Sequence, residues 1–470
     1  MKFDNNHKNK KPTNSTNPTI HNKPKPLDNS TDSTEKLTIE KLGNDFEGVC
    51  YTKQGRCLVK GALPNEVVLA DNPRKSGSVT IYNLKKVLKP SPLRVESPCK
   101  YQSICGACNL LYVSVEGQHK LKTDLIKRRL NDYRNLVSDI IYKQDSKRNK
   151  IQFSFAKAGT DIQIGFFNSV THKVEDIPEC LMHDNEKFQA VRLALKKWCK
   201  KYDIIAYNPH RQRGNLRFAV LRVLKDSLAI TLVFYKHIDD GLSYLYSLLK
   251  ESFSFVSLNT NINSEISNAV FSGNPEYCIG EKQIADRICG IDYLYQAGDF
   301  LQTNSEICAS VYNKVLEIIL NSGVKKVVDA YSGIGITTAL VAKNGLDVIS
   351  VEISEKAVET AKKTAKINNV ADKITFLSGD FNLALKDVDC DSESAMFVDP
   401  PRAGLGANVC QTILTKAPST LIYLSCEPKT LAADLKLLSA KYQPTLIQPY
   451  DMFPNTNHVE SLVCLTKQTN

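Results

Sequence analysis

The sequence predicts an α/β protein in which a small N-terminal β-barrel and a central α+β domain precede a C-terminal doubly wound parallel sheet. Two patterns support this fold class. Five short β-rich runs lie between residues 37 and 93, and strand-like and helix-like segments alternate from Asp299 onward. A chain of 470 residues accommodates two or three domains. We expect a tail at 1–36 and domains at 37–93, 94–290 and 291–470.

The predicted tail, residues 1–36, is rich in Asn, Lys, Thr, Ser and Pro and has almost no large apolar side chains. It cannot bury enough apolar surface to offset the entropy lost on ordering, so we expect it to be disordered. The chain has no apolar run long enough for a membrane span and no secretory signal. Its 14 cysteines therefore indicate thiols or metal ligands in a reducing cytoplasm.

The positive charge of the chain is confined to its first third. Residues 1–150 contain 28 Lys and Arg against 15 Asp and Glu, whereas residues 151–470 contain 33 against 35. This asymmetry predicts a polyanionic partner. The alternative is a soluble surface whose charge is merely uneven.

The β-rich runs of the first domain fit a closed barrel of the oligonucleotide-binding (OB) type. They cover residues 37–39, 48–51, 57–59, 67–70 and 79–82. Basic residues of this region are placed to line a surface that faces phosphates, namely Lys60, Arg74, Lys75, Lys85, Lys86 and Lys89.

The central part combines predicted helices at 118–131 and 186–201 with strands at 218–224 and 228–234. It also contains a cysteine motif, made of Cys99, Cys105, Cys108 and the more distant Cys180. Four thiolates suit zinc or an iron–sulfur cluster, and the spacing alone leaves both open.

A glycine-rich loop follows the first strand of the C-terminal domain, at 324–329. Gly333 and Gly335 lie in this loop, just before a helix that begins near Ile336. Glycines there let the backbone pass close to a ligand at the helix N-terminus. The loop therefore predicts a nucleotide-type cofactor.

Acidic residues end the next two strands of that domain. Glu352 follows strand 347–351, where a carboxylate can bind ribose hydroxyls, and Asp380 ends a third strand, within reach of an adenine. A dinucleotide-binding fold is the alternative, but Thr338 occupies the position of its third glycine.

Two further strands end in reactive side chains. The sequence Asp399-Pro400-Pro401-Arg402 follows one of them, and Cys426 follows the apolar run 421–424 and precedes a helix at 429–435. A helix N-terminus favours the thiolate form of such a cysteine, although a small buried residue is the alternative. Amino-group methylases of adenine usually have an aromatic residue after Asp-Pro-Pro, and Arg402 argues against that class.

These motifs together resemble the RNA uracil-C5 methyltransferases, a class I family that depends on S-adenosylmethionine. The likeness rests on Asp399 to Gly404, Ser425 to Pro428 with Thr430 and Leu431, His458 to Ser461, and Phe300 to Asn304, and it covers roughly residues 37–470. It implies a Rossmann-like methyltransferase domain at 291–470 and a TRAM domain at 37–93. One departure is Ile336, where some members have a polar residue.

The resemblance implies covalent catalysis. Carbon 5 of uracil is too poor a nucleophile to attack the sulfonium methyl group, but addition of a thiolate to carbon 6 makes it reactive, so Cys426 is the candidate nucleophile. The proton on carbon 5 must leave before the thiol is eliminated, and Glu460 is the candidate general base. A surface charge is the alternative interpretation of Glu460.

The resemblance also implies the binding residues. The family's S-adenosylmethionine positions correspond to Gln302, Tyr331, Gly333, Gly335, Glu352, Asp380 and Asp399. Phe300 is placed to stack near the flipped target base. Because a base leaves its stack most easily in a loop, we expect the RNA to bind as a loop or single-stranded segment.

The cysteine motif indicates the branch of the family. The ribosomal-RNA branch carries a [4Fe-4S] cluster, and Cys99, Cys105, Cys108 and Cys180 match its ligands, whereas the tRNA branch lacks these cysteines. The resemblance thus predicts a monomeric enzyme that methylates a uridine of 23S rRNA. The alternatives are a tRNA-methylating relative and an RNA-binding or assembly protein with a vestigial methylase.

Overall fold

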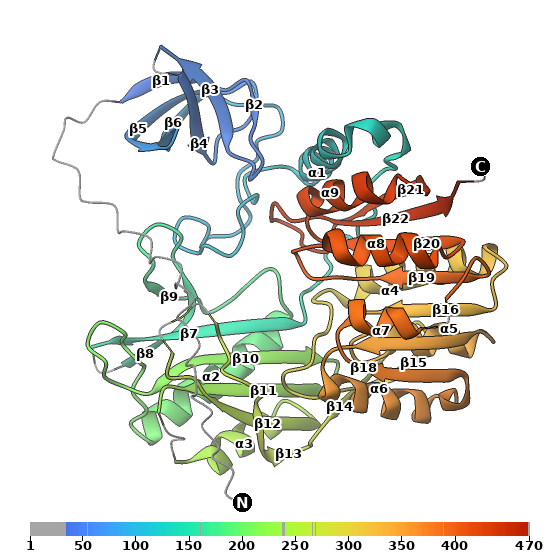
Figure 1. The fold of residues 1–470 in the computed structure, drawn as a ribbon. Coiled ribbons are helices and arrows are strands. Elements are labelled where there is room, and N and C mark those ends of the chain that lie inside the picture. Colours follow the sequence, from blue (N-terminus) through green and yellow to red (C-terminus); the bar gives the residue numbers. More distant parts are fainter. Residues whose placement is uncertain are drawn as a thin grey trace, which may run out of the picture.

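The computed structural model describes residues 34–53, 55–159, 161–236, 240–265, 267, 269–388 and 390–468. Figure 1 shows an N-terminal β-sheet, a central sheet with helices and a C-terminal sheet with helices on both faces. Residues 1–33 of the predicted tail lie outside the described residues. Strand β1 (Glu35–Thr38) begins inside that predicted tail, because Glu35 pairs with Ala70 and accepts a hydrogen bond from the Tyr82 hydroxyl at 3.0 Å.

The N-terminal sheet has the strand order β1-β5-β6-β4-β3-β2. Besides β1, its strands are β2 (Lys41–Leu42), β3 (Gly48–Thr52), β4 (Gly55–Lys60), β5 (Val67–Ser76) and β6 (Val79–Lys89). Between β1 and β2, the Ile39 N–H donates to the Glu66 carbonyl and the Glu40 N–H donates to the Val49 carbonyl. One continuous segment therefore bridges β5 and β3 and closes the sheet on itself. Every predicted β-rich run overlaps one of these strands.

The central sheet has the order β13-β12-β11-β10-β7-β8-β9. Its strands are β7 (Lys150–Ala158), β8 (Asp161–Phe167), β9 (Val174–Asp176), β10 (Leu216–Leu224), β11 (Ser227–Phe234), β12 (Phe255–Ile262) and β13 (Glu276–Gly280). Helices α2 (Asn185–Lys201) and α3 (Leu242–Lys250) pack on this sheet around the fully buried Trp198. A hairpin of β14 (Ile284–Ile288) and β15 (Ile291–Tyr295) leads to the C-terminal sheet.

The C-terminal sheet has the order β18-β17-β16-β19-β20-β22-β21. Its strands are β16 (Lys326–Ala330), β17 (Asp347–Glu352), β18 (Ile374–Ser378), β19 (Ser394–Val398), β20 (Thr420–Ser425), β21 (Tyr442–Tyr450) and β22 (Glu460–Lys467). Its helices are α4 (Ser305–Asn321), α5 (Ile336–Lys343), α6 (Glu355–Ile367), α7 (Phe381–Asp387), α8 (Gly406–Lys416) and α9 (Pro428–Leu438), with a short 3₁₀ turn, η2 (Ala371–Lys373).

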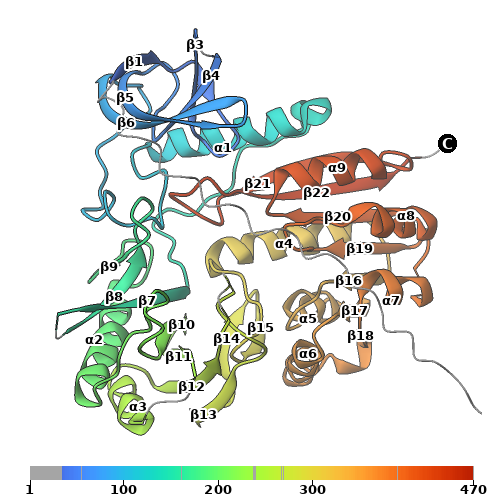
Figure 2. The same cartoon turned by 60° about the vertical axis from the view of Figure 1, so that its left-hand side comes forward.

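Both faces of this sheet are buried, which explains its uninterrupted apolar strands. Along β19, Met396 and Val398 face one hydrophobic core, whereas Ala395 and Phe397 face the other. Helices α4 to α6 pack on one side and α7 to α9 on the other, as Figure 2 shows. The predicted doubly wound arrangement is thus present.

One strand departs from the predicted parallel sheet. Strand β22 runs antiparallel to both of its neighbours, β20 and β21. Nine residues connect β21 to β22, at 451–459, and a parallel connection needs a crossover of a dozen or more residues. The short connection therefore forces the chain to return in the opposite direction.

A segment from the N-terminal third packs against the edge of the C-terminal sheet. Helix α1 (Val115–Arg129) lies beside α9, and a 3₁₀ turn, η1 (Asn131–Leu136), follows it (Figures 1 and 2). Beyond η1, Val137 and Ile141 form β-bridges with Ile447 and Tyr450 of β21. In the part of the chain that the structure describes, no helix is both long and apolar enough to cross a membrane.

Candidate active site

Five of the predicted site residues lie at one edge of the C-terminal sheet. Each stands at, or directly beyond, the carboxyl end of a parallel strand, where ligands of open α/β sheets bind. They are Tyr331 after β16, Glu352 in β17, Asp380 beyond β18, Asp399 after β19 and Cys426 after β20.

The antiparallel strand β22 brings Glu460 to the same edge. The ladder between β20 and β22 ends with the pair Ser425 and Ser461, so Cys426 directly follows this pair on one strand and Glu460 directly precedes it on the other. The two side chains lie close enough for the charge of Glu460 to raise the pKa of the Cys426 thiol. The reversal of β22 therefore places the candidate nucleophile beside the candidate base.

Two carboxyl groups of this edge, those of the buried Glu460 and the half-buried Asp399, hold their protons tightly. Burial raises the pKa of Glu460 to about 8, and Asp399 adds to the effect while Arg402 opposes it. Burial also raises the pKa of Asp399 to about 7, although a hydrogen bond from Gln302 opposes the shift. At neutral pH a large share of each group is protonated.

The thiol of Cys426 does not have the lowered pKa that its place before a helix predicts. This pKa is raised to about 11, mainly by burial and also by the charges of Glu460 and Asp399, which together outweigh the lowering effect of Arg402. The N-cap of α9 is the carboxylate of Glu427, which accepts the Lys429 N–H at 3.2 Å. The helix N-terminus after Cys426 is thus capped by an acidic side chain.

A basic pair, which the sequence analysis did not assign, lies across this edge. The Arg402 guanidinium is 3.4 Å from Nε2 of His458, which belongs to the loop before β22. Burial lowers the pKa of His458, and the charge of Arg402 lowers it further. The imidazole is therefore held neutral beside a permanent cation.

A buried aspartate, which the sequence analysis also missed, ties the two loops of the site together. Asp434 of α9 accepts hydrogen bonds from the Leu405 N–H at 2.8 Å, the Gly406 N–H at 3.1 Å and the Tyr423 hydroxyl at 2.7 Å. A Cβ atom on Gly404 would lie 2.5 Å from Oδ2 of Asp434, and its φ is +77°. The loop after Asp399 is thereby fixed to the helix that follows Cys426. In sequence, Asp434 looks like any helical aspartate.

Gln302 joins the central part of the protein to this site. Its Nε2 donates to Oδ2 of Asp399 at 3.2 Å. The backbone of this segment is held by buried side chains, because Asn149 donates to the Gln302 carbonyl at 3.1 Å and Arg222 donates to the Leu301 carbonyl at 2.9 Å. The orientation of Gln302 is therefore set by β10 and the residue before β7.

The glycine loop and the end of β17 also lie together. The Gly333 N–H donates to Oε2 of Glu352 at 3.0 Å, and the ring of Tyr331 packs on Phe381, next to Asp380, with centroids 5.3 Å apart. Tyr331 has a φ of 59°, a left-handed conformation that costs a bulky residue about 1–3 kcal/mol. Gly335, with a φ of +76°, is packed against Ala361. Such stored strain is typical of ligand-binding loops.

Just before this loop, in β16, Asp329 provides a buried carboxylate. Oδ2 of Asp329 accepts hydrogen bonds from Thr337 at 2.9 Å and from Thr338, whereas its buried Oδ1 has no hydrogen-bond partner. Carboxylates at the ends of β16, β17 and β19 suit the positive charge of a sulfonium cofactor. The residues present thus fit S-adenosylmethionine.

Phe300 stands apart from these contacts. Its side chain is 67% exposed, two residues before Gln302. Phe300 is thus close to the site in sequence, and its stacking role stays a prediction.

The four cysteines of the predicted cluster line one cavity. Cys99, Cys105, Cys108 and Cys180 share it with apolar side chains such as Leu111 and with the carboxylate of Glu179. The thiol donor set and the apolar lining fit an iron–sulfur group. However, among the described residues, no three His, Cys, Asp or Glu side chains are placed so that they could hold a metal ion. The geometry itself therefore does not support the predicted cluster.

Known proteins resemble this chain over most of its length. The profile of the tRNA (Uracil-5-)-methyltransferase family matches residues 116–468. An uncharacterized RNA methyltransferase of Clostridium tetani is 29% identical over 448 residues, covering 92% of this chain and 96% of its own. A second one, of Halalkalibacterium halodurans, is 29% identical over 446 residues with the same coverage.

A solved structure extends this similarity to the fold. The tRNA (uracil-54, C5)-methyltransferase of Pyrococcus abyssi, in complex with S-adenosyl-L-homocysteine, matches with a TM-score of 0.75 and 26% identity, over 92% of this chain and 100% of that one. The match of family profile, relatives and fold shows that the chain belongs to the tRNA (uracil-5-)-methyltransferase family of S-adenosylmethionine-dependent RNA methyltransferases.

Proposed function

We propose that the protein transfers a methyl group from S-adenosylmethionine to carbon 5 of a uridine in 23S rRNA, through a covalent adduct of Cys426. The observation that supports this proposal is the register of β20 and β22, whose last pair, Ser425 with Ser461, is flanked by Cys426 and Glu460. A thiol and a buried carboxyl group with a pKa of about 8 are the two groups that a pyrimidine C5 methylation requires.

Each group has one role. The Cys426 thiolate adds to carbon 6, and the electrons of the carbon 5–carbon 6 double bond move onto the carbonyl of carbon 4 as an enolate. Bound S-adenosylmethionine supplies an electrophilic methyl group for carbon 5. The Glu460 carboxylate then takes the proton from carbon 5, the double bond re-forms, and the bond between sulfur and carbon 6 breaks.

Neighbouring residues prepare this chemistry. Arg402 lowers the pKa of the Cys426 thiol, and so opposes the effect of burial. Gln302 orients Asp399 at the strand end, where a carboxyl group can face cofactor or target base. We propose Tyr331, Gly333, Gly335, Glu352 and Asp380 as the remaining cofactor contacts and Phe300 as the stacking residue for the flipped base.

A trapping experiment tests the mechanism. The protein is incubated with labelled S-adenosylmethionine and an rRNA fragment that contains 5-fluorouracil, whose fluorine cannot leave as a proton, so that the adduct persists. We expect a covalent protein–RNA complex with wild-type protein and none with Cys426→Ala. A complex that persists in Cys426→Ala, or no complex with wild-type protein, would remove this mechanism.

The choice of rRNA as substrate rests on two features. Four cysteines share one cavity, as the resemblance to the ribosomal-RNA branch implies, and the first 150 residues have a basic excess suited to a large RNA. We propose that the N-terminal barrel acts as a TRAM domain and holds nucleotides that flank the target. The second candidate substrate is tRNA, which the name of the Pyrococcus abyssi relative favours. Mapping 5-methyluridine in the rRNA and tRNA of a deletion strain separates the two: loss from tRNA alone would overturn the rRNA assignment.

We further propose that Cys99, Cys105, Cys108 and Cys180 hold a [4Fe-4S] cluster. Anaerobically purified protein should contain about four iron and four sulfide per chain and absorb visible light. If the purified protein contained zinc and no sulfide, the four cysteines would instead form a zinc site. We also propose that the protein works as a monomer and in the cytoplasm.

A further inference from the structure

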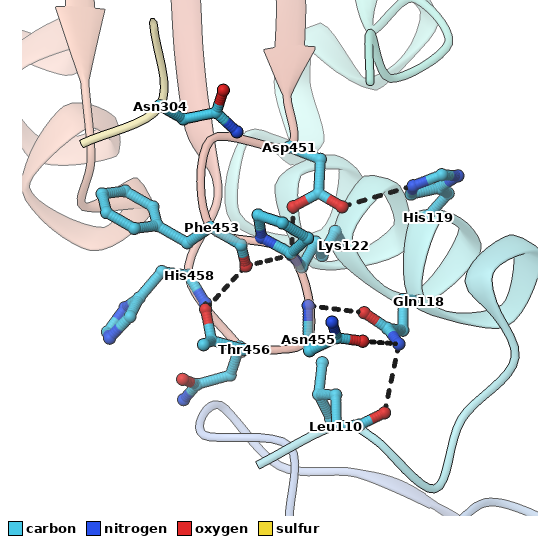
Figure 3. Close-up of polar contacts among 12 residues, drawn as sticks. Leu110, Gln118, His119, Lys122, Asn304, Asp451, Phe453, Asn455, Thr456 and His458 are labelled. Carbon is cyan, nitrogen blue, oxygen red and sulfur yellow. Dashed lines mark hydrogen bonds and ion pairs between the residues drawn. The ribbon is translucent and has the colours of Figure 1, made fainter. Parts of the chain in front are cut away.

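The loop 451–458, between β21 and β22, has contacts that the proposed reaction does not explain. It carries His458 and ends two residues before Glu460, so its position sets that of the candidate base. Figure 3 shows that side chains of α1, more than 300 residues away in sequence, point into this loop.

A buried ion pair forms the centre of these contacts. Nζ of Lys122, whose side chain is fully buried, lies 2.6 Å from Oδ1 of Asp451 and donates to the Phe453 carbonyl at 3.0 Å. Nε2 of His119 lies 3.3 Å from the other carboxylate oxygen of Asp451 (Figure 3). Burial alone would raise the pKa of Asp451, but Lys122 and His119 outweigh it and hold the pKa below its usual range. A buried ammonium persists only where such partners are fixed.

A second contact joins the same helix to the tip of the loop. Oε1 of Gln118 accepts the Asn455 N–H at 2.9 Å, and Nε2 of Gln118 donates to Oδ1 of Asn455 at 3.0 Å. The same Nε2 also reaches the carbonyls of Leu110 and Val113. Gln118 is 3% exposed, so water cannot replace these bonds readily.

The third set of contacts comes from the segments that follow two of the four cysteines. Directly after Cys108, the Leu110 N–H donates to the Asn455 carbonyl at 3.0 Å, and the Asn109 side chain accepts the Asn457 N–H at 3.0 Å. Two residues after Cys180, the Met182 sulfur lies 3.1 Å from Nδ2 of Asn455. The loop therefore contacts Met182, which lines the four-cysteine cavity, and the two residues that directly follow Cys108.

We propose that Gln118, Lys122 and the segments after Cys108 and Cys180 form a clamp that positions Glu460, and that the clamp makes this position depend on the four-cysteine region. The clamp residues are positioning residues, because they act through the loop and not on the RNA. The inference rests on the proposed role of Glu460, but its first test is independent of that role.

That first test is amide hydrogen exchange of the full-length protein. In Lys122→Met, we expect the Asn455 and Asn457 amides to exchange more than about tenfold faster, because a buried aspartate loses its strongest partner. Lys120→Met is the matched control, since Lys120 lies exposed on the same helix. Equal exchange of the loop in the two variants would overturn the clamp.

The second test separates the steps of the reaction. At saturating RNA, the clamp predicts that Lys122→Met forms the adduct with 5-fluorouracil RNA within about threefold of the wild-type rate but releases methylated product from uridine RNA more than about tenfold more slowly. A purely structural defect would slow both steps alike, which would overturn the positioning role. If the wild-type protein formed no adduct, the proposed function would fail while the exchange result still decided the clamp.

Two milder variants guard against failure to fold and test the link to the cysteines. Asn109 is exposed, so Asn109→Ala should fold normally and speed exchange of the Asn457 amide. Cys108→Ser should speed exchange of the Asn455 and Asn457 amides while the amides of β16 stay protected. Unchanged loop exchange in Cys108→Ser would overturn the dependence on the four-cysteine region.

Discussion

Replacement of Glu460 by glutamine tests the proposed chemistry most directly. The side chain is 3% exposed at the start of β22, and the amide has nearly the same shape but cannot take up the proton from carbon 5. Loss of a general base slows a reaction by about 10²- to 10⁴-fold. We therefore expect product release by Glu460→Gln to fall by that factor.

Formation of the Cys426 adduct, the first step of the reaction, should not be slowed in Glu460→Gln. Where Glu460 is ionised, above about pH 8, its charge raises the pKa of the Cys426 thiol, so a neutral amide makes the thiolate easier to form there. Adduct formation by Glu460→Gln should therefore be at least as fast as in the wild type. The variant should accumulate the covalent complex with ordinary uridine RNA.

The pH profile gives a further signature of the base. With a pKa of about 8, roughly one tenth of Glu460 is ionised at pH 7, so wild-type release should rise with pH and level off above about 8. The variant should lose this rise. Rapid quenching with labelled RNA, followed by separation of adduct and product on a denaturing gel, measures both steps.

The control is Glu427→Gln, which replaces another carboxyl group next to Cys426, the one that caps α9. It should keep wild-type release and its pH profile. Release at the wild-type rate in Glu460→Gln, or an unchanged rise with pH in that variant, would show that another group removes the proton.

Four further outcomes follow from the structure. The folded-state pKa of Glu460 is raised from 4.5 to about 8, so the native state holds this proton more tightly and loses stability as pH rises between those values. Glu460→Gln should therefore raise Tm relative to wild type more at pH 8 than at pH 5, and an equal Tm difference at both pH values would contradict a buried carboxyl group at this position. Because the thiol pKa is about 11, adduct formation with 5-fluorouracil RNA should speed up about tenfold per pH unit between about pH 7 and 9, whereas a flat profile would mean that RNA or cofactor binding creates the thiolate. Asp434→Ala leaves two buried donors, the Leu405 N–H and the Tyr423 hydroxyl, without their acceptor and should destabilise the protein by about 3 kcal/mol in urea unfolding, against little change for the exposed Lys436→Ala. Phe300→Ala should leave stability within about 0.5 kcal/mol but raise KM for RNA, and an unchanged KM would end its stacking role.

The local elements of the catalytic sheet could be predicted from sequence because their signals are local. The apolar run 421–424 lies inside β20, and the glycine loop ends where α5 begins at Ile336. Strands buried on both faces need uninterrupted apolar residues, and the glycines supply the positive φ angles of the turn. Both signals therefore come from residues that are adjacent in the sequence.

The direction of β22 and the environment of Cys426 could not be predicted in this way. The residues of β22 fit a strand of either direction, and the length of the loop that reverses it is known only when both strand ends are known. The helix after Cys426 favours a thiolate, but burial, together with the charges of Glu460 in β22 and Asp399 after β19, outweighs it. Such effects depend on which strands are neighbours in space.

The burial of Lys122 could not be predicted from the sequence either. It lies in a helix rich in lysine and arginine and resembles its exposed neighbour Lys120 in every local respect. Its burial depends on Asp451, 329 residues further along the chain. No helical periodicity reveals a partner at that distance.

The insertion of β22 between β20 and β21 has a consequence for how the enzyme matures. Both flanking strands are synthesised before β22, and the sheet keeps a gap of one strand until it arrives. If the proposed mechanism holds, a chain without β22 in place would have the candidate nucleophile Cys426 but lack the candidate base Glu460, and it would capture RNA without releasing it. Completion of the sheet and the ability to turn over are therefore acquired in a single step.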